Sequence, residues 1–173
     1  MTSPASWRSD LIRARKDLCR EGICRTALVG IGSVLRADDA IGMDVARALL
    51  PVFAQRDDVL VIEAGVAPEN TTGTLRKFRP DLIVFIDAAD MGEKPGAIRW
   101  LDWRDSIGLS ASTHTLPLHV LAEFLTKDLG CEVGLIGIQA SVIGFGRAYG
   151  RELVPKVEEI ADGMKEIFFG EVR

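Results

Sequence analysis

The segment Thr26-Ala-Leu-Val-Gly-Ile-Gly-Ser-Val-Leu-Arg-Ala-Asp-Asp-Ala-Ile-Gly42 joins an apolar run to a polar turn and to the start of a helix. Its first six residues carry no charge, and four of them are apolar. Such an uncharged run without alternation is typical of a parallel strand that is buried on both faces. A helix is predicted from about Asp38 to Ala54, because apolar residues recur there at helical spacing and Asp38 is well placed to cap its first turn. The segment therefore predicts a strand, loop and helix of an α/β domain.

The rest of the chain alternates in the same way between apolar runs and amphipathic stretches. We expect further strands over residues 59–62, 82–86 and 133–139, and a more exposed edge strand over residues 97–101. Helices are expected over residues 6–20, 71–79, 117–129 and 152–168. This order predicts an α/β three-layer sandwich, in which helices cover both faces of a mostly parallel, twisted sheet of about five strands.

Length and composition predict one globular unit. The chain has 173 residues, of which 47% are hydrophobic and 27% are charged, as in an ordinary soluble domain. We expect a helical extension over residues 1–24, followed by a single α/β domain over residues 25–173.

Charge and hydropathy exclude several classes of partner. The formal net charge is −4 and no basic cluster occurs, so nucleic-acid binding is not expected. No apolar run approaches the roughly 20 residues that cross a bilayer, and the polar N-terminus lacks the apolar core of a signal peptide. We therefore expect a cytoplasmic protein without membrane insertion.

The three cysteines, Cys19, Cys24 and Cys131, are odd in number and show no CxxC spacing. Neither a disulfide framework nor a structural zinc site is expected from this pattern. The sequence predicts reduced thiols, as in most cytosolic proteins.

Several known catalytic or cofactor-binding motifs are absent from the sequence. Gly30 and Gly32 look like the start of a dinucleotide fingerprint, but Leu35 stands where the third glycine would lie. The P-loop pattern, the GxSxG elbow and the HExxH motif do not occur. We interpret the two glycines as residues of a tight strand-to-loop turn with positive φ.

Three side chains able to bind a metal lie where apolar runs give way to loops, namely Asp39, Asp87 and His114. In a doubly wound sheet the first strand lies between the second and the third, and ligands bind at the carboxyl ends of these strands. Asp39 and Asp87 follow the first and third strands, so they are expected to converge. With His114 they would offer a divalent metal two carboxylates and one imidazole, and leave coordination positions open.

Each of these side chains also has a structural alternative. The Asp38-Asp39 pair at a helix start can cap the helix, and Asp87 can accept hydrogen bonds from the turn that follows it. His114 can be an ordinary loop residue, and the only other histidine, His119, is predicted within a helix as a surface or packing residue.

Five blocks of sequence, in this order, resemble the hydrogenase maturation endopeptidases, and the likeness covers roughly residues 25–168. It is closest to the branch that processes the large subunit of group 4, formate-hydrogenlyase-type hydrogenases. The blocks are Gly30–Gly42, Ala64–Asn70, Ile86–Gly92, Ser112–Pro117 and Leu135–Gln139.

The resemblance implies a function for the three candidate ligands. The family's two acidic ligands fall on Asp39 and Asp87, and its histidine falls on His114. The metal would be the nickel of the substrate's [NiFe] centre, although zinc or cadmium can take the same ligands. The enzyme would be an aspartyl-type or metal-dependent endopeptidase that removes the C-terminal extension of the precursor of a [NiFe]-hydrogenase large subunit.

The role of the nickel stays open at this point. It can polarise the scissile carbonyl, generate the attacking hydroxide, or serve only as a recognition handle while a carboxylate activates water. Two residues near the expected cleft depart from the family pattern: Ser33 stands where Asn is usual, and Glu63 stands where Asp is common. Both leave the three ligands intact.

Two other functions remain as alternatives. A non-catalytic metal-binding chaperone for hydrogenase assembly would keep the same ligands and bind the precursor without cutting it. A generic small-molecule α/β enzyme is a more distant third.

Overall fold

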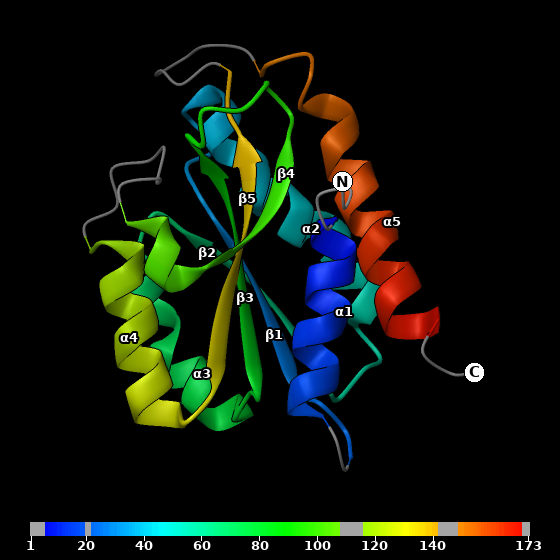
Figure 1. Ribbon diagram of the computed structural model, residues 1–173, viewed down its shortest axis with the longest axis vertical. Coiled ribbons are helices and arrows are strands. Elements are labelled where there is room, and N and C mark those ends of the chain that lie inside the picture. The colour runs from blue at the N-terminus through cyan, green and yellow to red at the C-terminus, as the bar shows by residue number, and fades with distance from the viewer. Residues whose placement is uncertain (1–5, 20–21, 108–115, 142–148, 171–173) are drawn as a thin grey trace, which may run out of the picture.

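The computed structural model describes residues 6–19, 22–107, 116–141 and 149–170 (Figure 1). The strands are β1 (Thr26–Ile31), β2 (Val59–Gly65), β3 (Leu82–Ala89), β4 (Ile98–Asp102) and β5 (Glu132–Gln139). The α-helices are α1 (Trp7–Leu18), α2 (Ile41–Phe53), α3 (Thr72–Phe78), α4 (Leu118–Leu129) and α5 (Val154–Gly170). Three short 3-10 helices are η1 (Ala37–Ala40), η2 (Pro68–Thr71) and η3 (Trp103–Ser106).

The strands form a five-stranded sheet in the order β2-β1-β3-β5-β4. The pairings of β1 with β2, β1 with β3 and β3 with β5 are parallel. The edge strand β4 runs antiparallel to β5. The predicted α/β sandwich is confirmed, and so is the position of the first strand between the second and the third.

Helices cover both faces of this sheet, with α1, α2 and α5 on one side and α3 and α4 on the other (Figure 1). Neighbouring residues of a strand point to opposite faces of the sheet and pack in different hydrophobic cores. In β3, Val84 packs with the first group of helices and Phe85 with the second. Because both faces are covered, every residue of β1 and β3 is buried, which explains why these strands appear in the sequence as apolar runs without alternation.

Helix α1 belongs to the first of these cores. Its Trp7 and Leu11 side chains are buried with residues of α2 and α5. Trp7 lies against Gly163 of α5, where an added Cβ would come within 2.6 Å of the indole ring. The residues predicted as an N-terminal extension thus contribute to the packing of the domain.

Two of the differences from the predicted element boundaries bear on the candidate site residues. Strand β3 continues to Ala89, so Asp87 lies within the strand and does not close it, because β3 keeps pairing with β5 as far as Gln139. The helix predicted from Asp38 begins as the 3-10 turn η1, and α2 starts only at Ile41.

The prediction of three reduced thiols is wrong for two of them. Cys19, which caps the end of α1, and Cys24, which lies two positions before β1, form a disulfide with Cα atoms 5.2 Å apart. Cys131 is free and buried.

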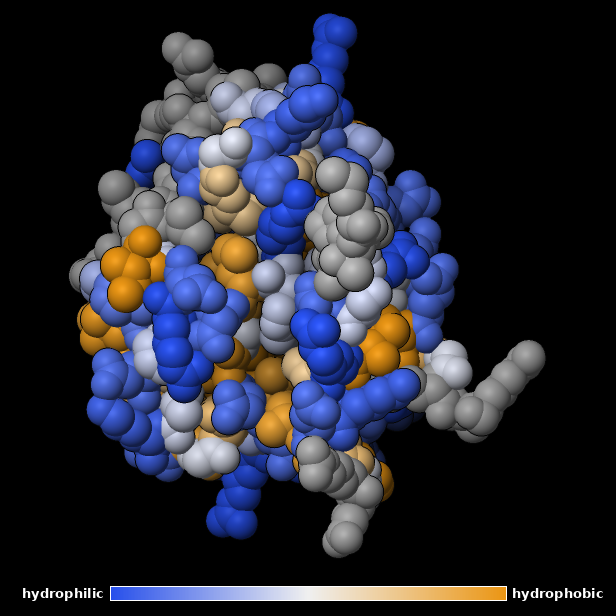
Figure 2. Space-filling model, in the orientation of Figure 1, coloured by the Kyte–Doolittle hydropathy of each residue, from blue (hydrophilic) through white to orange (hydrophobic). Residues whose placement is uncertain are grey.

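Hydrophilic side chains cover most of the face seen in Figure 2, and hydrophobic ones appear between them in patches. Among the described residues, no helix is long and apolar enough to cross a membrane.

Candidate active site

Asp39 lies in η1, at the carboxyl end of β1, and only 1% of its surface is exposed. Its Oδ2 atom accepts a hydrogen bond of 3.0 Å from the backbone N–H of Ser33, and its own N–H donates to the carbonyl of Arg36 at 3.0 Å. Gly32 has φ +134°, and a Cβ there would lie 1.7 Å from the Asp39 carbonyl oxygen. The predicted positive φ is therefore confirmed at Gly32, where it lets η1 fold back onto the strand.

Gly30 serves a different purpose from the one predicted, since its φ is not positive. A Cβ at Gly30 would lie 2.2 Å from the carbonyl oxygen of Gly42 in α2. A Cβ at Gly42 would lie 2.1 Å from the Ile86 carbonyl oxygen and 2.3 Å from that of Ile31. These glycines let the first turn of α2 cross directly over the ends of β1 and β3.

Asp87 lies at the same edge of the sheet as Asp39 and is 2% exposed. The register pairs Ile86 with Gly30, which places Asp87 level with Ile31, the last residue of β1. Contacts between η1 and β3 bring the turn that carries Asp39 against the strand that carries Asp87.

One oxygen of Asp39 lacks a hydrogen-bond partner in the part of the chain that the structure describes. Asp39 Oδ1 is buried and accepts no hydrogen bond from a described residue. Buried carboxylate oxygens are normally satisfied, and an exception points to an ion, a water or a catalytic role. A cation is one such partner, because carboxylates are common metal ligands.

His114, the third candidate ligand, lies outside the described residues. Within those residues no group of three His, Cys, Asp or Glu side chains is placed to hold a metal. His119, the other histidine, is partly exposed on α4.

Asp38 does not cap a helix, so that prediction is wrong. It is fully buried within η1, and its carboxylate accepts hydrogen bonds from Ser141 and from the backbone of Gly150. These partners follow it by more than 100 positions, and no local signal in the sequence indicates them.

Gln139, at the end of β5, has a role near the candidate site that the sequence did not indicate by itself. Its Oε1 atom accepts hydrogen bonds from the backbone N–H groups of Met91 at 2.7 Å and Glu93 at 3.2 Å. It thereby fixes the loop that follows β3 and Asp87. Its membership in the block Leu135–Gln139 was the only signal of its importance.

Ser33 and Glu63, the two residues that depart from the family pattern, contact different parts of the domain. Ser33 holds Asp39 through its backbone N–H, which any residue at that position can supply except proline. Glu63 pairs with Arg47 of α2 at 2.9 Å.

Cys131 is not a suitable nucleophile. Burial raises the pKa of its thiol to about 11, so the thiol stays protonated at neutral pH. Its Sγ–H points to the Leu125 carbonyl oxygen at 3.8 Å.

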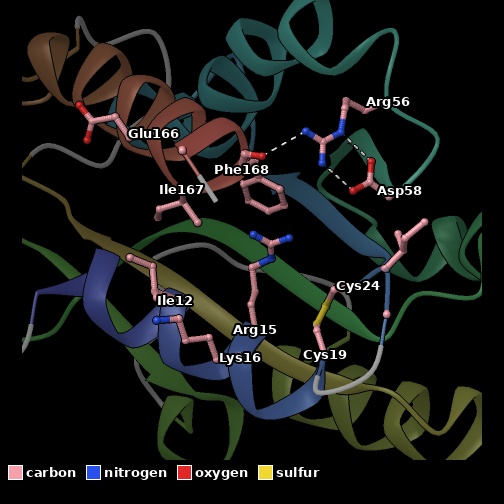
Figure 3. A pocket seen from close by; sticks show the side chains of 13 residues that line it. Ile12, Arg15, Lys16, Cys19, Cys24, Arg56, Asp58, Glu166, Ile167 and Phe168 are labelled. Carbon is pink, nitrogen blue, oxygen red and sulfur yellow. Dashed lines mark hydrogen bonds and ion pairs between the residues drawn. A yellow bond between two sulfur atoms is a disulfide. The ribbon is translucent and has the colours of Figure 1, made fainter. Parts of the chain in front are cut away.

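A cleft of about 680 Å³ lies between α1 and the C-terminal half of α5 (Figure 3). Its lining includes Cys24, two positions before β1, and Asp58, directly before β2. It is therefore at the amino end of the strands, whereas Asp39 and Asp87 are at the carboxyl end. Open sheets of this class bind ligands at the carboxyl ends of their strands, so the aspartates mark the candidate active site.

Comparison with known proteins gives a consistent result. Residues 43–171 match the family described as HycI, hydrogenase maturation protease. The hydrogenase 3 maturation protease of Escherichia coli K12 is 32% identical over 142 residues, which cover 82% of this chain and 85% of that protein.

Solved structures agree in fold as well as in sequence. The crystal structure of the [NiFe] hydrogenase maturation protease HycI from Thermococcus kodakarensis matches with a TM-score of 0.79 and 32% identity, over 93% of this chain and 99% of that chain. The solution structure of the endopeptidase HycI from E. coli matches with a TM-score of 0.69 and 33% identity, over 79% and 86% of the two chains.

These similarities confirm the resemblance seen in the sequence blocks, and they make the chain a hydrolase of the protease class. By sequence and by fold, it belongs to the hydrogenase maturation protease family.

Proposed function

We propose that this protease recognises the nickel-loaded precursor of a [NiFe]-hydrogenase large subunit and removes its C-terminal extension, with Asp39, Asp87 and His114 as the site residues. The observation that carries the proposal is the buried Asp39 Oδ1 atom without a hydrogen-bond partner among the described residues, beside the strand that bears Asp87.

The side chains of Asp39, Asp87 and His114 are suitable ligands for nickel that arrives with the substrate. Two carboxylates and one imidazole are ligands that nickel accepts, and they do not select it over zinc or cadmium. Selection would come from the precursor, whose own ligands occupy the remaining positions. The nickel would then mark a precursor that is ready for cutting.

The chemical step is hydrolysis of one peptide bond. The water oxygen bonds to the scissile carbonyl carbon, the C–N bond breaks, and the nitrogen of the released tail takes up a proton. A carboxylate placed beside the nickel is the group that this chain offers to accept a proton from the attacking water. Asp39 and Asp87 are buried carboxylates near the carboxyl ends of β1 and β3.

The experiment compares nickel-loaded and nickel-free precursor, each incubated with the purified protease, by mass spectrometry of the precursor. We expect the mass of a C-terminal peptide to be lost only from the nickel-loaded form. Cleavage of both forms at equal rates would contradict nickel recognition. Tight binding of the nickel-loaded precursor without cleavage would contradict the protease and favour an assembly chaperone.

A further inference from the structure

Two consecutive carboxylates, those of Asp38 and Asp39, have entirely different partners. Asp39 is held at the end of β1 by the backbone N–H of Ser33. Asp38 Oδ2 accepts hydrogen bonds from the Ser141 N–H at 2.6 Å and from the Ser141 hydroxyl at 2.9 Å. Asp38 Oδ1 accepts a hydrogen bond from the Gly150 N–H at 2.6 Å. The Asp38 carboxylate thus faces a part of the chain that follows β5.

These contacts join η1 to both described ends of the connection between β5 and α5. Ser141 lies two positions after the end of β5, and Gly150 lies four positions before the start of α5. The approach is close, since a Cβ at Gly150 would lie 2.3 Å from the Ser141 hydroxyl oxygen and 3.0 Å from Asp38 Oδ1. One buried side chain therefore anchors both ends of this connection at the turn that carries Asp39.

The contact requires a carboxylate and not merely a polar side chain. Both oxygens of Asp38 accept hydrogen bonds from backbone N–H groups. In an Asp38→Asn variant one of these N–H groups would face the amide NH2, which is also a donor. The variant keeps the shape of the side chain and still loses at least one hydrogen bond to the backbone.

We propose that Asp38 is a positioning residue of this protease, which sets the place of Asp39 by tying η1 to the connection between β5 and α5. The loss of cleavage that we expect in Asp38 variants rests on the proposed function of Asp39. The change in the position of Asp39 that we expect in the same variants does not rest on that function.

A double-mutant cycle tests the effect on cleavage. The rate of processing of nickel-loaded precursor is measured for the full-length protein and for the variants Asp38→Asn, Asp39→Asn and the double variant. A residue that acts through another gives non-additive losses. We expect Asp38→Asn alone to lower kcat/KM by about 10- to 100-fold, and to add less than about threefold in the Asp39→Asn background.

The control is Asp128→Asn, which makes the same chemical change in an exposed ion pair with Arg76 on the far edge of the domain. We expect it to leave kcat/KM unchanged. Equal factors for Asp38→Asn in both backgrounds would overturn the proposal, and so would a rate for Asp38→Asn equal to that of the control.

Hydrogen exchange tests the position of Asp39 without any substrate. The Ser33 amide donates to Asp39 Oδ2, so we expect Asp38→Asn to speed its exchange by about tenfold or more, while the Val84 amide in the centre of β3 keeps its rate. Ser141→Ala removes only the hydroxyl contact to Asp38, so we expect a smaller increase in the exchange rate of the Ser33 amide. This variant replaces Asp38→Asn in the test if Asp38→Asn does not fold. An unchanged Ser33 rate in the folded variant would overturn the proposal. A wild-type protein that fails to cleave the precursor would overturn the proposed function alone.

Discussion

At the level of single residues, the candidate site depends on a buried carboxylate, one oxygen of which accepts no hydrogen bond from a described residue. Such an oxygen costs free energy in the folded protein, and proteins commonly accept this cost at functional sites. Asp39 has this character, whereas Asp38 next to it is satisfied by three hydrogen bonds. The contrast supports the proposed chemical role of Asp39 and the proposed positioning role of Asp38.

Asp39→Asn should therefore separate activity from stability. We expect the rate of precursor processing to fall at least about 100-fold, because a charged ligand is lost. The melting temperature should stay the same or rise, since a buried charge is removed. Enzyme assays and thermal unfolding measure the two effects, with Asp128→Asn as the control. A variant that processes precursor at the wild-type rate would show that Asp39 is not part of the site.

The sequence could indicate Asp39 and Asp87, because each follows an apolar run and strand order can be inferred from handedness rules. It could not indicate the task of Asp38, whose partners lie more than 100 positions away. A polar residue at a predicted helix start has the same local pattern whether it caps that helix or anchors another segment.

At the level of elements, the close packing of α2 on the sheet is set by glycine. A Cβ at Gly42 would lie 2.1 Å from the Ile86 carbonyl oxygen, and backbone atoms of a buried strand cannot easily move. Gly42→Ala should destabilise the protein by about 3 kcal/mol or more.

The matched control is Gly73→Ala in α3, where an added Cβ meets nothing within 4 Å. That change should be neutral or stabilise the protein by up to about 1 kcal/mol. Urea unfolding measures both variants. Equal stabilities would contradict the packing described for α2.

A second element contact joins the start of β2 to the end of α5. Arg56 donates to both oxygens of Asp58, at 2.7 and 2.6 Å, and to the Phe168 carbonyl oxygen at 3.1 Å (Figure 3). The hydrogen bond from the Arg56 guanidinium holds the pKa of Asp58 below its ordinary value.

This contact should make stability depend on pH. Because the pKa of Asp58 is lower in the folded protein than in the unfolded chain, its contribution is fully present above about pH 4 and is lost as the pH falls through the folded pKa. Asp58→Asn should cost up to about 1 kcal/mol at pH 7 and progressively less toward pH 3. Unfolding measured across this pH range checks the trend, and a cost that grows in acid would contradict it.

At the level of the whole molecule, one sheet with two helical layers holds the site at its carboxyl edge. The sequence predicted this architecture, because β1 and β3 are covered on both faces and appear as unbroken apolar runs. It did not predict that β3 extends beyond Asp87, since that extension depends on pairing with β5. Nor did it predict the pairing of Cys19 with Cys24, which depends on how the end of α1 is placed beside the start of β1.

Substitutions in the N-terminal helix α1 test whether this helix and the rest of the domain unfold as one cooperative unit. Leu11 is fully buried in the core shared with α2 and α5, whereas Leu18 of the same helix is 37% exposed. Leu11→Ala should destabilise the protein by about 2–5 kcal/mol, and Leu18→Ala by less than about 1 kcal/mol. Equal small effects in urea unfolding would show that α1 is dispensable.

The central claim is that Asp39, Asp87 and His114 act together on the nickel-loaded precursor. Its most direct test is the rate of precursor processing by His114→Ala, with His119→Ala as the matched control because these are the only two histidines of the chain. We predict that His114→Ala loses processing by at least about 100-fold while keeping its melting temperature, and that His119→Ala processes normally. Processing by His114→Ala at the wild-type rate would contradict the claim.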